Sequence, residues 1–341
     1  MRVSEEAYGG REAWDAYVAS RPESLFYHRQ VWRLAVENAY GERAFYLAAR
    51  NEDGVLAGVL PLFLVGPCKS RRRLLSLPHA PAAGLLADTP EIARALEAGA
   101  LELAGRLCGG RMHWRDQPAP QPDSQWPGLA TYRLPLPETA EALWRGFRSE
   151  IRNRTRKAQK NGVTVREGRE LLPNFYRIYE RHMRELGTPP HPPIFFSTLA
   201  DAEPKRLTVS LAMLGEEPIA GMIRVRHGDV ATAVWVSSLA RYNAASPVNL
   251  LYWEAMSDAI ATGARLFDFG RGRPGAGPTV FKIRYGAIPH PLTRHVWPFI
   301  PADPVAEAAI SPFMETVSRL WRHLPLPVAT SLGRRARRYL P

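Results

Sequence analysis

A lysine beside a glycine-rich stretch is the first residue of this sequence whose type and setting suggest chemistry. The chain has five lysines against 40 arginines, and one of them, Lys282, stands between Phe281 and Ile283. Where arginine is the usual cation, a lysine at such a position indicates that a compact ammonium is needed. An ammonium can stabilise the oxyanion of an acyl-transfer intermediate. The alternative is a half-buried strand lysine whose head group reaches solvent.

The stretch that precedes this lysine contains Gly270-x-Gly272-x-x-Gly275, the spacing of a dinucleotide-binding fingerprint. That fingerprint requires a helix that opens at its last glycine. Pro274, Pro278 and a segment of strand-like composition at 280–285 follow instead. We therefore predict a flexible loop that joins two strands, and no dinucleotide site.

Three charged side chains in or next to this loop are candidate site residues. Asp268 ends the preceding strand, and Arg271 and Arg273 lie within the loop. A guanidinium group suits phosphate and carboxylate ligands because its donors form a planar fork. The loop is therefore expected to reach an anionic ligand.

A strongly basic helix is predicted before this region. Residues 145–160 contain seven basic side chains and a single acid, Glu150. At 3.6 residues per turn, one face carries Arg148, Arg152, Arg156 and Lys160, whose like charges repel. Phosphates or carboxylates would offset that repulsion, which makes Arg152 and Arg156 candidate substrate ligands. The alternative is a plain solvated helix.

Other residue patterns are weaker or point away from a site. Tyr242 and Asn249 border the start of a predicted helix, where an anion can bind, although Asn249 is equally suited to a polar helix start. The nine histidines include no pair at metal-ligand spacing with a supporting acid, so we expect no metal site. Cys68 and Cys108 have no local nucleophile signature and are interpreted as small core residues.

The elements that must position these residues follow from periodicity and from turn residues. In the first half we expect helices at 24–39 and 89–109, and strands at 45–50, 55–65, 111–115 and 131–136. In the second half we expect helices at 138–161, 171–186, 194–202 and 247–263, and strands at 163–167, 207–214, 219–226, 230–238 and 266–269.

A local pattern occurs in both halves. A strand, a polar turn and a second strand containing Ala57-Gly58 correspond to a strand, a turn and a strand containing Ala220-Gly221. A duplicated unit explains this similarity, although any polar hairpin followed by a buried strand looks alike. The predicted class is α/β (α+β), with mixed, mostly antiparallel sheets flanked by helices. We divide the chain into domains 1–136 and 137–300 and a basic amphipathic tail, 301–341.

Charge is unevenly distributed over these segments. The chain of 341 residues carries net charge +12, of which +1 falls on 1–136, +8 on 137–300 and +3 on 301–341. The excess suggests an anionic partner for the second half, although arginine-rich coding accounts for part of the bulk charge. The tail could contact an anionic membrane face or dock on the protein.

Composition excludes several classes of protein. A hydrophobic content of 45% is too high for a disordered chain. The longest apolar run has about twelve residues, too short for a membrane span. Two cysteines cannot form a disulfide framework. The first residues include Glu5 and Glu6, where a signal peptide has basic residues. We therefore expect a reduced, cytoplasmic compartment, in which the tail could contact the inner membrane.

Several motifs together resemble the FemAB-like branch of the GNAT acyltransferase superfamily, in particular FemAB-related proteins of exosortase (PEP-CTERM) and exopolysaccharide loci. They are Phe26-Tyr-His-Arg-Gln-Val-Trp32, Gly58-Val-Leu-Pro-Leu62, Ser76-Leu-Pro78, Pro247-x-Asn-x-Leu-Tyr-Trp253, Asp268-Phe-Gly-Arg271 and Phe281-Lys-Ile-Arg-Tyr-Gly286. The resemblance implies two tandem GNAT-like domains. It implies transfer of an acyl or aminoacyl group to an amine or hydroxyl of a cell-envelope or polysaccharide precursor. The family's lysine after a phenylalanine matches Lys282 after Phe281.

The donor implied by the resemblance is aminoacyl-tRNA or acyl-CoA, used as a co-substrate, with no tightly bound cofactor. The pyrophosphate loop of the acetyl-CoA enzymes, Arg/Gln-x-x-Gly-x-Gly/Ala, has no convincing match. We assign Lys282 and Asp268 as catalytic, and Phe281, Arg271, Arg152, Arg156, Tyr242, Asn249 and His182 as substrate-binding. Asp268, His182 and Glu254 are the candidates for a general base. The competing hypothesis is a non-catalytic GNAT scaffold that binds RNA or another anionic polymer.

Overall fold

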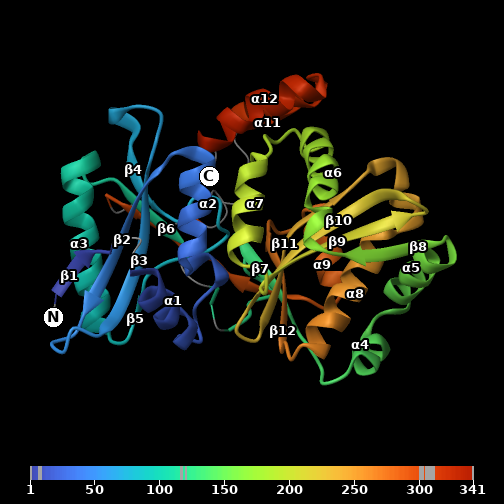
Figure 1. Cartoon of the computed structure of the whole chain (residues 1–341), viewed down its shortest axis with the longest axis horizontal. Helices are drawn as coiled ribbons and strands as arrows, with labels where there is room; N and C mark the ends of the chain where they lie inside the picture. The colour runs from blue at the N-terminus through green and yellow to red at the C-terminus, as the bar shows by residue number, and fades with distance from the viewer. Residues whose placement is uncertain are drawn as a thin grey trace.

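The computed structural model describes residues 2–6, 10–115, 118–119, 121–298, 303 and 312–339. Two mixed sheets stand side by side, and helices cover their faces (Figure 1). The predicted α/β class with two similar halves is confirmed.

The first sheet has the strand order β1-β2-β3-β4-β6-β14, with β5 paired to β3. Only the β4–β6 pair is parallel. Its strands are β1 (Arg2–Glu5), β2 (Arg43–Arg50), β3 (Leu56–Val65), β4 (Arg73–Ser76), β5 (Leu86–Ala87), β6 (Met112–Arg115) and β14 (Arg294–Trp297). Its helices are α1 (Arg11–Ser20), α2 (Gln30–Tyr40) and α3 (Pro90–Cys108).

The second sheet has the order β13-β7-β12-β11-β10-β9-β8, and only the β11–β12 pair is parallel. Its strands are β7 (Ala130–Pro135), β8 (Val163–Glu167), β9 (Leu207–Leu214), β10 (Glu217–His227), β11 (Val230–Ser238), β12 (Leu266–Gly272) and β13 (Ile288–Pro291). Its helices are α4 (Ala140–Gly146), α5 (Ser149–Lys160), α6 (Leu172–Glu185), α7 (Pro193–Ala202), α8 (Pro247–Ala261) and α9 (Gly277–Arg284).

The two sheets repeat one strand order and exchange one strand. β1, β2, β3, β4, β6 and β14 correspond in sequence of pairing to β8, β9, β10, β11, β12 and β7. β7 precedes the proposed boundary at 136/137 yet pairs in the second sheet, and β14 follows it yet pairs in the first. The strand order supports duplication, and the exchange ties the two halves together.

The Ala-Gly dipeptides that suggested the duplication are not structurally equivalent. A Cβ on Gly58 would meet Ile92 and Leu96 of α3, whereas a Cβ on Gly221 would meet Phe175 of α6. The helix that corresponds to α3 is α8, because α3 connects the parallel strands β4 and β6 and α8 connects the corresponding strands β11 and β12. The two glycines therefore face opposite sides of their sheets, and the alignment by sequence is one residue out of phase.

One apolar core spans both halves. Trp32 of α2 packs edge-on against Phe195 of α7 at 5.3 Å and stacks on Trp235 of β11 at 6.3 Å. These ring contacts, together with the exchanged strands, fix the relative position of the halves.

Two predicted elements have a different form. The helix expected at 138–161 is broken into α4 and α5, because Phe147 adopts an extended conformation and its ring packs 5.4 Å from Tyr285. The segment at 280–285, predicted as strand, belongs to α9, where Thr279 and Lys282 are buried on one side. Pro278 in the first turn fits this helix, since its missing N–H is one that the helix leaves unpaired.

The described part of the tail, α11 (Pro312–His323) and α12 (Leu326–Ala336), docks on both halves (Figure 1). Ser318 Oγ donates to the carbonyl of Leu186 at 3.2 Å, and Arg338 pairs with Glu42 at 2.8 Å. Trp321 is buried. The side chains of Phe313 and Arg334, which also belong to this tail, lie outside the part of the chain that the structure describes. No helix in the described ranges has the length and apolar content needed to cross a bilayer.

Candidate active site

The second sheet opens where β11 and β12 separate. They pair only at Val230–Thr232 with Leu266–Asp268, while β11 continues along β10 to Ser238. Among the described strands none pairs with β11 beyond Thr232 on this side, so alternate backbone groups there face the gap. A pocket of about 530 Å³ occupies this region, a size typical of small-molecule sites.

The pocket collects residues from four elements and from the turn before α8. It is lined by His182, Leu186, Val236, Ser237, Ser238, Asn243, Ser246, Pro247, Val248, Asn249, Tyr252, Pro278, Phe281 and Lys282. Four of the nine residues predicted for the site therefore share one cavity: His182, Asn249, Phe281 and Lys282.

Lys282 is buried at the pocket, on α9 instead of the predicted strand. Its Nζ donates to the carbonyl oxygens of Gly270 at 2.8 Å and Arg271 at 2.9 Å. The pKa of Lys282 is lowered to about 8, mainly by burial; the Asp268 carboxylate opposes this shift and the Arg271 cation adds to it. The ammonium is thus fixed at the end of β12 and is mostly charged at neutral pH.

His182 faces the same pocket from α6. Its Nδ1 is buried and has no hydrogen-bond partner among the described residues. Burial lowers the pKa of His182 below its ordinary value, which leaves the ring neutral at pH 7. A neutral imidazole can accept a proton, so His182 is the base candidate that the structure brings to the pocket.

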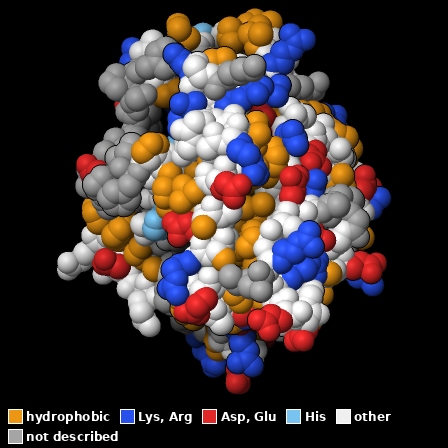
Figure 2. Space-filling model, turned by 90° about the vertical axis from the view of Figure 1, so that its left-hand side faces the viewer, with side chains coloured by type: hydrophobic (Ala, Val, Ile, Leu, Met, Phe, Trp, Pro, Cys, Tyr) orange, Lys and Arg blue, Asp and Glu red, His pale blue; other side chains and the backbone are white. Residues whose placement is uncertain are grey.

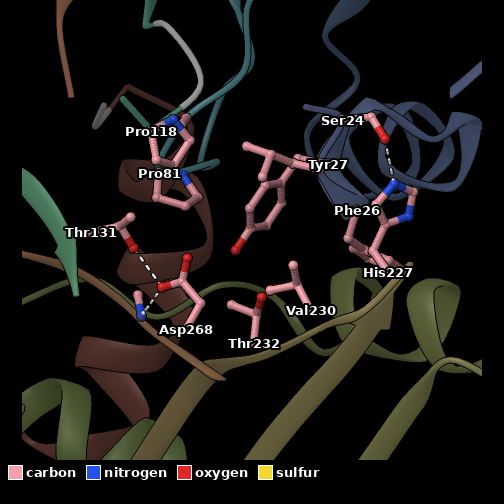
Figure 3. A pocket seen from close by; sticks show the side chains of 13 residues that line it. Ser24, Phe26, Tyr27, Pro81, Pro118, Thr131, His227, Val230, Thr232 and Asp268 are labelled. Carbon is pink, nitrogen blue, oxygen red and sulfur yellow. Dashed lines mark hydrogen bonds between the residues drawn. The ribbon is translucent and has the colours of Figure 1, made fainter. Parts of the chain in front are cut away.

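Asp268 lies outside the pocket and is fully engaged. It accepts hydrogen bonds from Thr131 Oγ1, from the amide of Gly270 at 2.7 Å and from Arg133 Nε at 3.1 Å. It lines a separate cavity of about 20 Å³ between the halves, opposite Tyr27 (Figure 3). That volume admits about one water molecule. The geometry makes Asp268 an anchor for the loop that receives Lys282.

The glycine loop leads from a strand to a helix. We predicted that no helix follows Gly275 and excluded a dinucleotide site for that reason. A helix does begin at Gly277, so this reason is wrong. The exclusion still stands on topology, because α9 leads to β13, which pairs antiparallel to β7, and no βαβ unit forms. The Arg271 residue is exposed to solvent. Its pKa is nevertheless lowered to about 9, first because many protein atoms around the guanidinium group displace water, and second because Arg115 and other arginines lie nearby.

The two arginines predicted on the basic helix face away from the pocket. Arg152 Nη1 donates to the carbonyls of Phe147 and Arg145, the latter at 3.3 Å, and so caps the end of α4. Arg156 lies over the ring of Trp144 at 5.4 Å. Both side chains hold α4 against α5.

Another face of α5 meets the site. A groove of about 370 Å³ adjoins the pocket through Asn243 and Ser246 and is also lined by Glu150, Asn153, Arg154, Lys157 and Ala244. The first turn of α8 begins there, and Ser246 makes no side-chain capping bond. The sequence analysis included Arg154 and Lys157 among the seven basic side chains of this helix, but it chose the neighbouring face, which carries Arg152 and Arg156, as the candidate ligand-binding face. Their spacing of three on one helix face was the available signal.

The remaining candidates divide in the same way. Asn249 lines the pocket, and its Nδ2 donates to the hydroxyl of Tyr285 at 2.9 Å. Tyr242 lies outside the lining, and its hydroxyl donates to Glu217. Glu254 also lies outside it, and burial and Glu167 raise its pKa. Within the described ranges, no three His, Cys, Asp or Glu side chains form a group that could hold a metal.

Comparisons with known proteins agree with this geometry. Residues 145–282 match the family model described as "Acetyltransferase (GNAT) domain". This range begins in α4 and ends at Lys282. A search of curated protein sequences gave no match.

Solved structures match over most of the chain. A crystal structure of FemX is 16% identical, covers 86% of this chain and 95% of its own, and has a TM-score of 0.66. The tandem GNAT protein from the clavulanic acid biosynthesis pathway is 12% identical, covers 89% and 99%, and has a TM-score of 0.53. L-PGS from Bacillus licheniformis is 12% identical, covers 85% and 95%, and has a TM-score of 0.52.

At these identities the solved structures establish the fold, and the family model establishes the domain that holds the pocket. Residues 145–282 therefore form an acetyltransferase (GNAT) domain, and the chain as a whole shares its fold with FemX and with the tandem GNAT protein.

Proposed function

We propose that this protein transfers an acyl group from a phosphate-bearing donor to an amine or hydroxyl of a cell-envelope or exopolysaccharide-related acceptor. The observation that carries the proposal is the convergence of Lys282 and His182 on one pocket at the point where β11 and β12 separate. The donor carbonyl would lie between the free edge of β11 and α9.

The residues divide the chemistry between them. The acceptor's oxygen or nitrogen attacks the donor carbonyl carbon, and His182 takes the proton that the acceptor loses. Charge develops on the carbonyl oxygen, where the Lys282 ammonium and free β11 amides stabilise it. The intermediate then collapses and releases the donor's thiol or hydroxyl, which receives the proton from His182.

The adjoining groove suits the donor's phosphates. Arg154 and Lys157 supply cations, and the uncapped N-terminus of α8 supplies backbone N–H groups. The turn before α8 has the sequence Arg241-x-x-Ala244-x-Ser246. Compared with the pyrophosphate loop Arg/Gln-x-x-Gly-x-Gly/Ala of the acetyl-CoA enzymes, alanine replaces the first glycine and serine replaces the last small residue. Both acyl-CoA and aminoacyl-tRNA remain donors under this proposal.

We extend the proposal to location. The tail's outward surface carries Leu320, Val328 and Leu332, which are 66%, 43% and 49% exposed, beside exposed arginines. Such a surface suits an anionic membrane face, consistent with a cytoplasmic protein that acts at the inner membrane.

The decisive experiment is Lys282→Met, with Lys205→Met as the matched control at an exposed lysine. Donor use is first detected by mass spectrometry of the full chain with a panel of acyl-CoAs and charged tRNAs. Lys282→Met should lower kcat by about 100-fold or more, as expected when a group that stabilises the oxyanion is removed. Donor affinity should change little, the melting temperature should fall modestly because the carbonyls of Gly270 and Arg271 lose their donor, and Lys205→Met should behave as wild type.

Two results would contradict the proposal. One is unchanged kcat in a folded Lys282→Met protein. The other is salt-dependent binding of tRNA with no loss of any donor's acyl group, which would favour the non-catalytic RNA-binding scaffold.

A further inference from the structure

Half of the residues that line the candidate active-site pocket are apolar, and none of the described lining residues is a carboxylate. The apolar residues are Leu186, Val236, Pro247, Val248, Tyr252, Pro278 and Phe281. The polar ones are hydroxyls, amides, one histidine and one lysine. A positively charged group inside this pocket would find no opposite charge.

The pocket instead holds a cation of its own. Lys282 lines the pocket. Asp268, the carboxylate that acts on the pKa of Lys282, lines a different cavity and pairs with Arg133 at 3.1 Å. Glu217, on the strand beside β11, is taken by Arg241 at 2.7 Å. An ammonium on the donor's acyl group would therefore meet a like charge in partly desolvated surroundings, which is unfavourable.

An apolar side chain on a turn that the tail contacts lines the pocket. Leu186 is 48% exposed and ends α6. The tail holds this turn in place: Ser318 Oγ donates to the carbonyl of Leu186 at 3.2 Å, and a Cβ on Gly187 would come within 2.2 Å of Ser318 Oγ. An ordered, half-exposed leucine at a pocket rim offers surface that an apolar ligand would cover.

From these observations we infer that the transferred acyl group is neutral and apolar, and that donors with a free ammonium on the acyl group are discriminated against. The inference rests on the proposed function and narrows its donor class. The lining of Leu186, Val248 and Phe281, with Lys282 as the one side chain of the described lining that is charged at neutral pH, sets this preference.

The test uses two donors that differ by one terminal ammonium. Propionyl-CoA and β-alanyl-CoA share the carrier and the three-carbon acyl chain, and only the second carries an ammonium on its last carbon. Dissociation constants for the full chain are measured by calorimetry. Propionyl-CoA should bind at least tenfold more tightly, and octanoyl-CoA more tightly still. Equal affinities, or tighter binding of β-alanyl-CoA, would overturn the inference.

A variant reverses the prediction. Val248→Asp places a carboxylate in the pocket at the second residue of α8, where an acid also suits the helix dipole. It should reduce the preference for propionyl-CoA by at least tenfold. Val55→Asp, at an exposed valine of the β2–β3 turn, is the control and should leave the preference unchanged. A preference that is the same in Val248→Asp and wild type would count against the pocket as its source.

Failure of this inference can be told from failure of the proposed function. If no CoA ester binds, alanyl-tRNA and N-acetylalanyl-tRNA provide the same charge comparison in a turnover assay. Faster use of the N-acetylated donor supports the inference. Faster or equal use of alanyl-tRNA refutes it while the acyltransferase proposal stands, and loss of neither acyl group refutes both.

Discussion

The two halves of the molecule share a strand order but differ in what fills the gap next to their parallel pair. In the second half, β11 runs on to Ser238 and the gap is a pocket. In the first half, β4 ends at Ser76, and the chain that follows returns: Ala83 bridges to Arg115, and β5 pairs with β3. The first half thus fills with its own backbone the place where the second half leaves room for a ligand.

The helices after these strands differ in the same sense. α3 is capped by Thr89, whose hydroxyl accepts from the amide of Ile92, whereas Ser246 before α8 makes no side-chain capping bond. The first turn of α8 thus has no side-chain cap beside the pocket, although Pro247 has no N–H and the amide of Asn249 donates to the carbonyl of Ser246; in α3 the Thr89 hydroxyl caps one amide.

Surface charge follows the division. The outer face of the first half shows acidic and basic side chains intermixed (Figure 2), in keeping with a net charge of +1 for 1–136 against +8 for 137–300. The half with the filled gap is thus close to neutral, and the half with the pocket carries most of the net charge.

The largest expected effect concerns the base in the open gap. His182→Gln should lower kcat by about 10³-fold, because general base catalysis typically contributes 10²–10⁴-fold. In wild type, activity should rise with pH through the lowered pKa of His182, since the base must be neutral. It should fall above about pH 8, where Lys282 loses its proton.

The measurement is the pH profile of kcat for both proteins. His182→Gln should lose the rising limb and keep the fall near pH 8. If kcat of the variant still rises and falls with pH as in wild type, another group takes the proton. Lys282 would then be the one proposed catalytic residue that distinguishes the pocket of the second half from the filled gap of the first.

An intermediate effect is expected when the filled gap is emptied. Leu86 of β5 is 1% exposed, so Leu86→Ala should destabilise the fold by about 2–5 kcal/mol through lost burial and a residual cavity. Donor affinity should stay unchanged, because the pocket lies in the other half. Denaturant unfolding with donor titration checks both; a large loss of affinity with little loss of stability would break the comparison.

The smallest effect distinguishes the two helix starts. Thr89→Ala removes the cap of α3 and should cost about 1 kcal/mol of stability. Ser246→Ala should cost less, since its side chain makes no capping bond. Equal losses in chemical unfolding would mean that the two helix starts do not differ as described.

Local sequence signals determined most of the individual elements. Thr89-Pro90 starts α3 as predicted, because a capping hydroxyl followed by proline suits a first turn. The alternating strands β9, β10 and β11 and the helix from Pro247 also lie where their periodicity placed them. The isolated lysine and the family resemblance led to Lys282, Phe281 and Asn249 as site predictions, and His182 was one of three candidate bases; these four residues line the same pocket.

Tertiary structure decided the features that depend on distant contacts. The segment around Phe281 has strand-like composition, but burial of Thr279 and Lys282 on one side makes it helical, since packing overrides weak local preference. The exchange of β7 and β14 joins residues more than a hundred positions apart. The face of α5 that meets the site was likewise fixed by the packing of Arg152 and Arg156 on α4, and helical periodicity alone cannot tell which face meets a ligand.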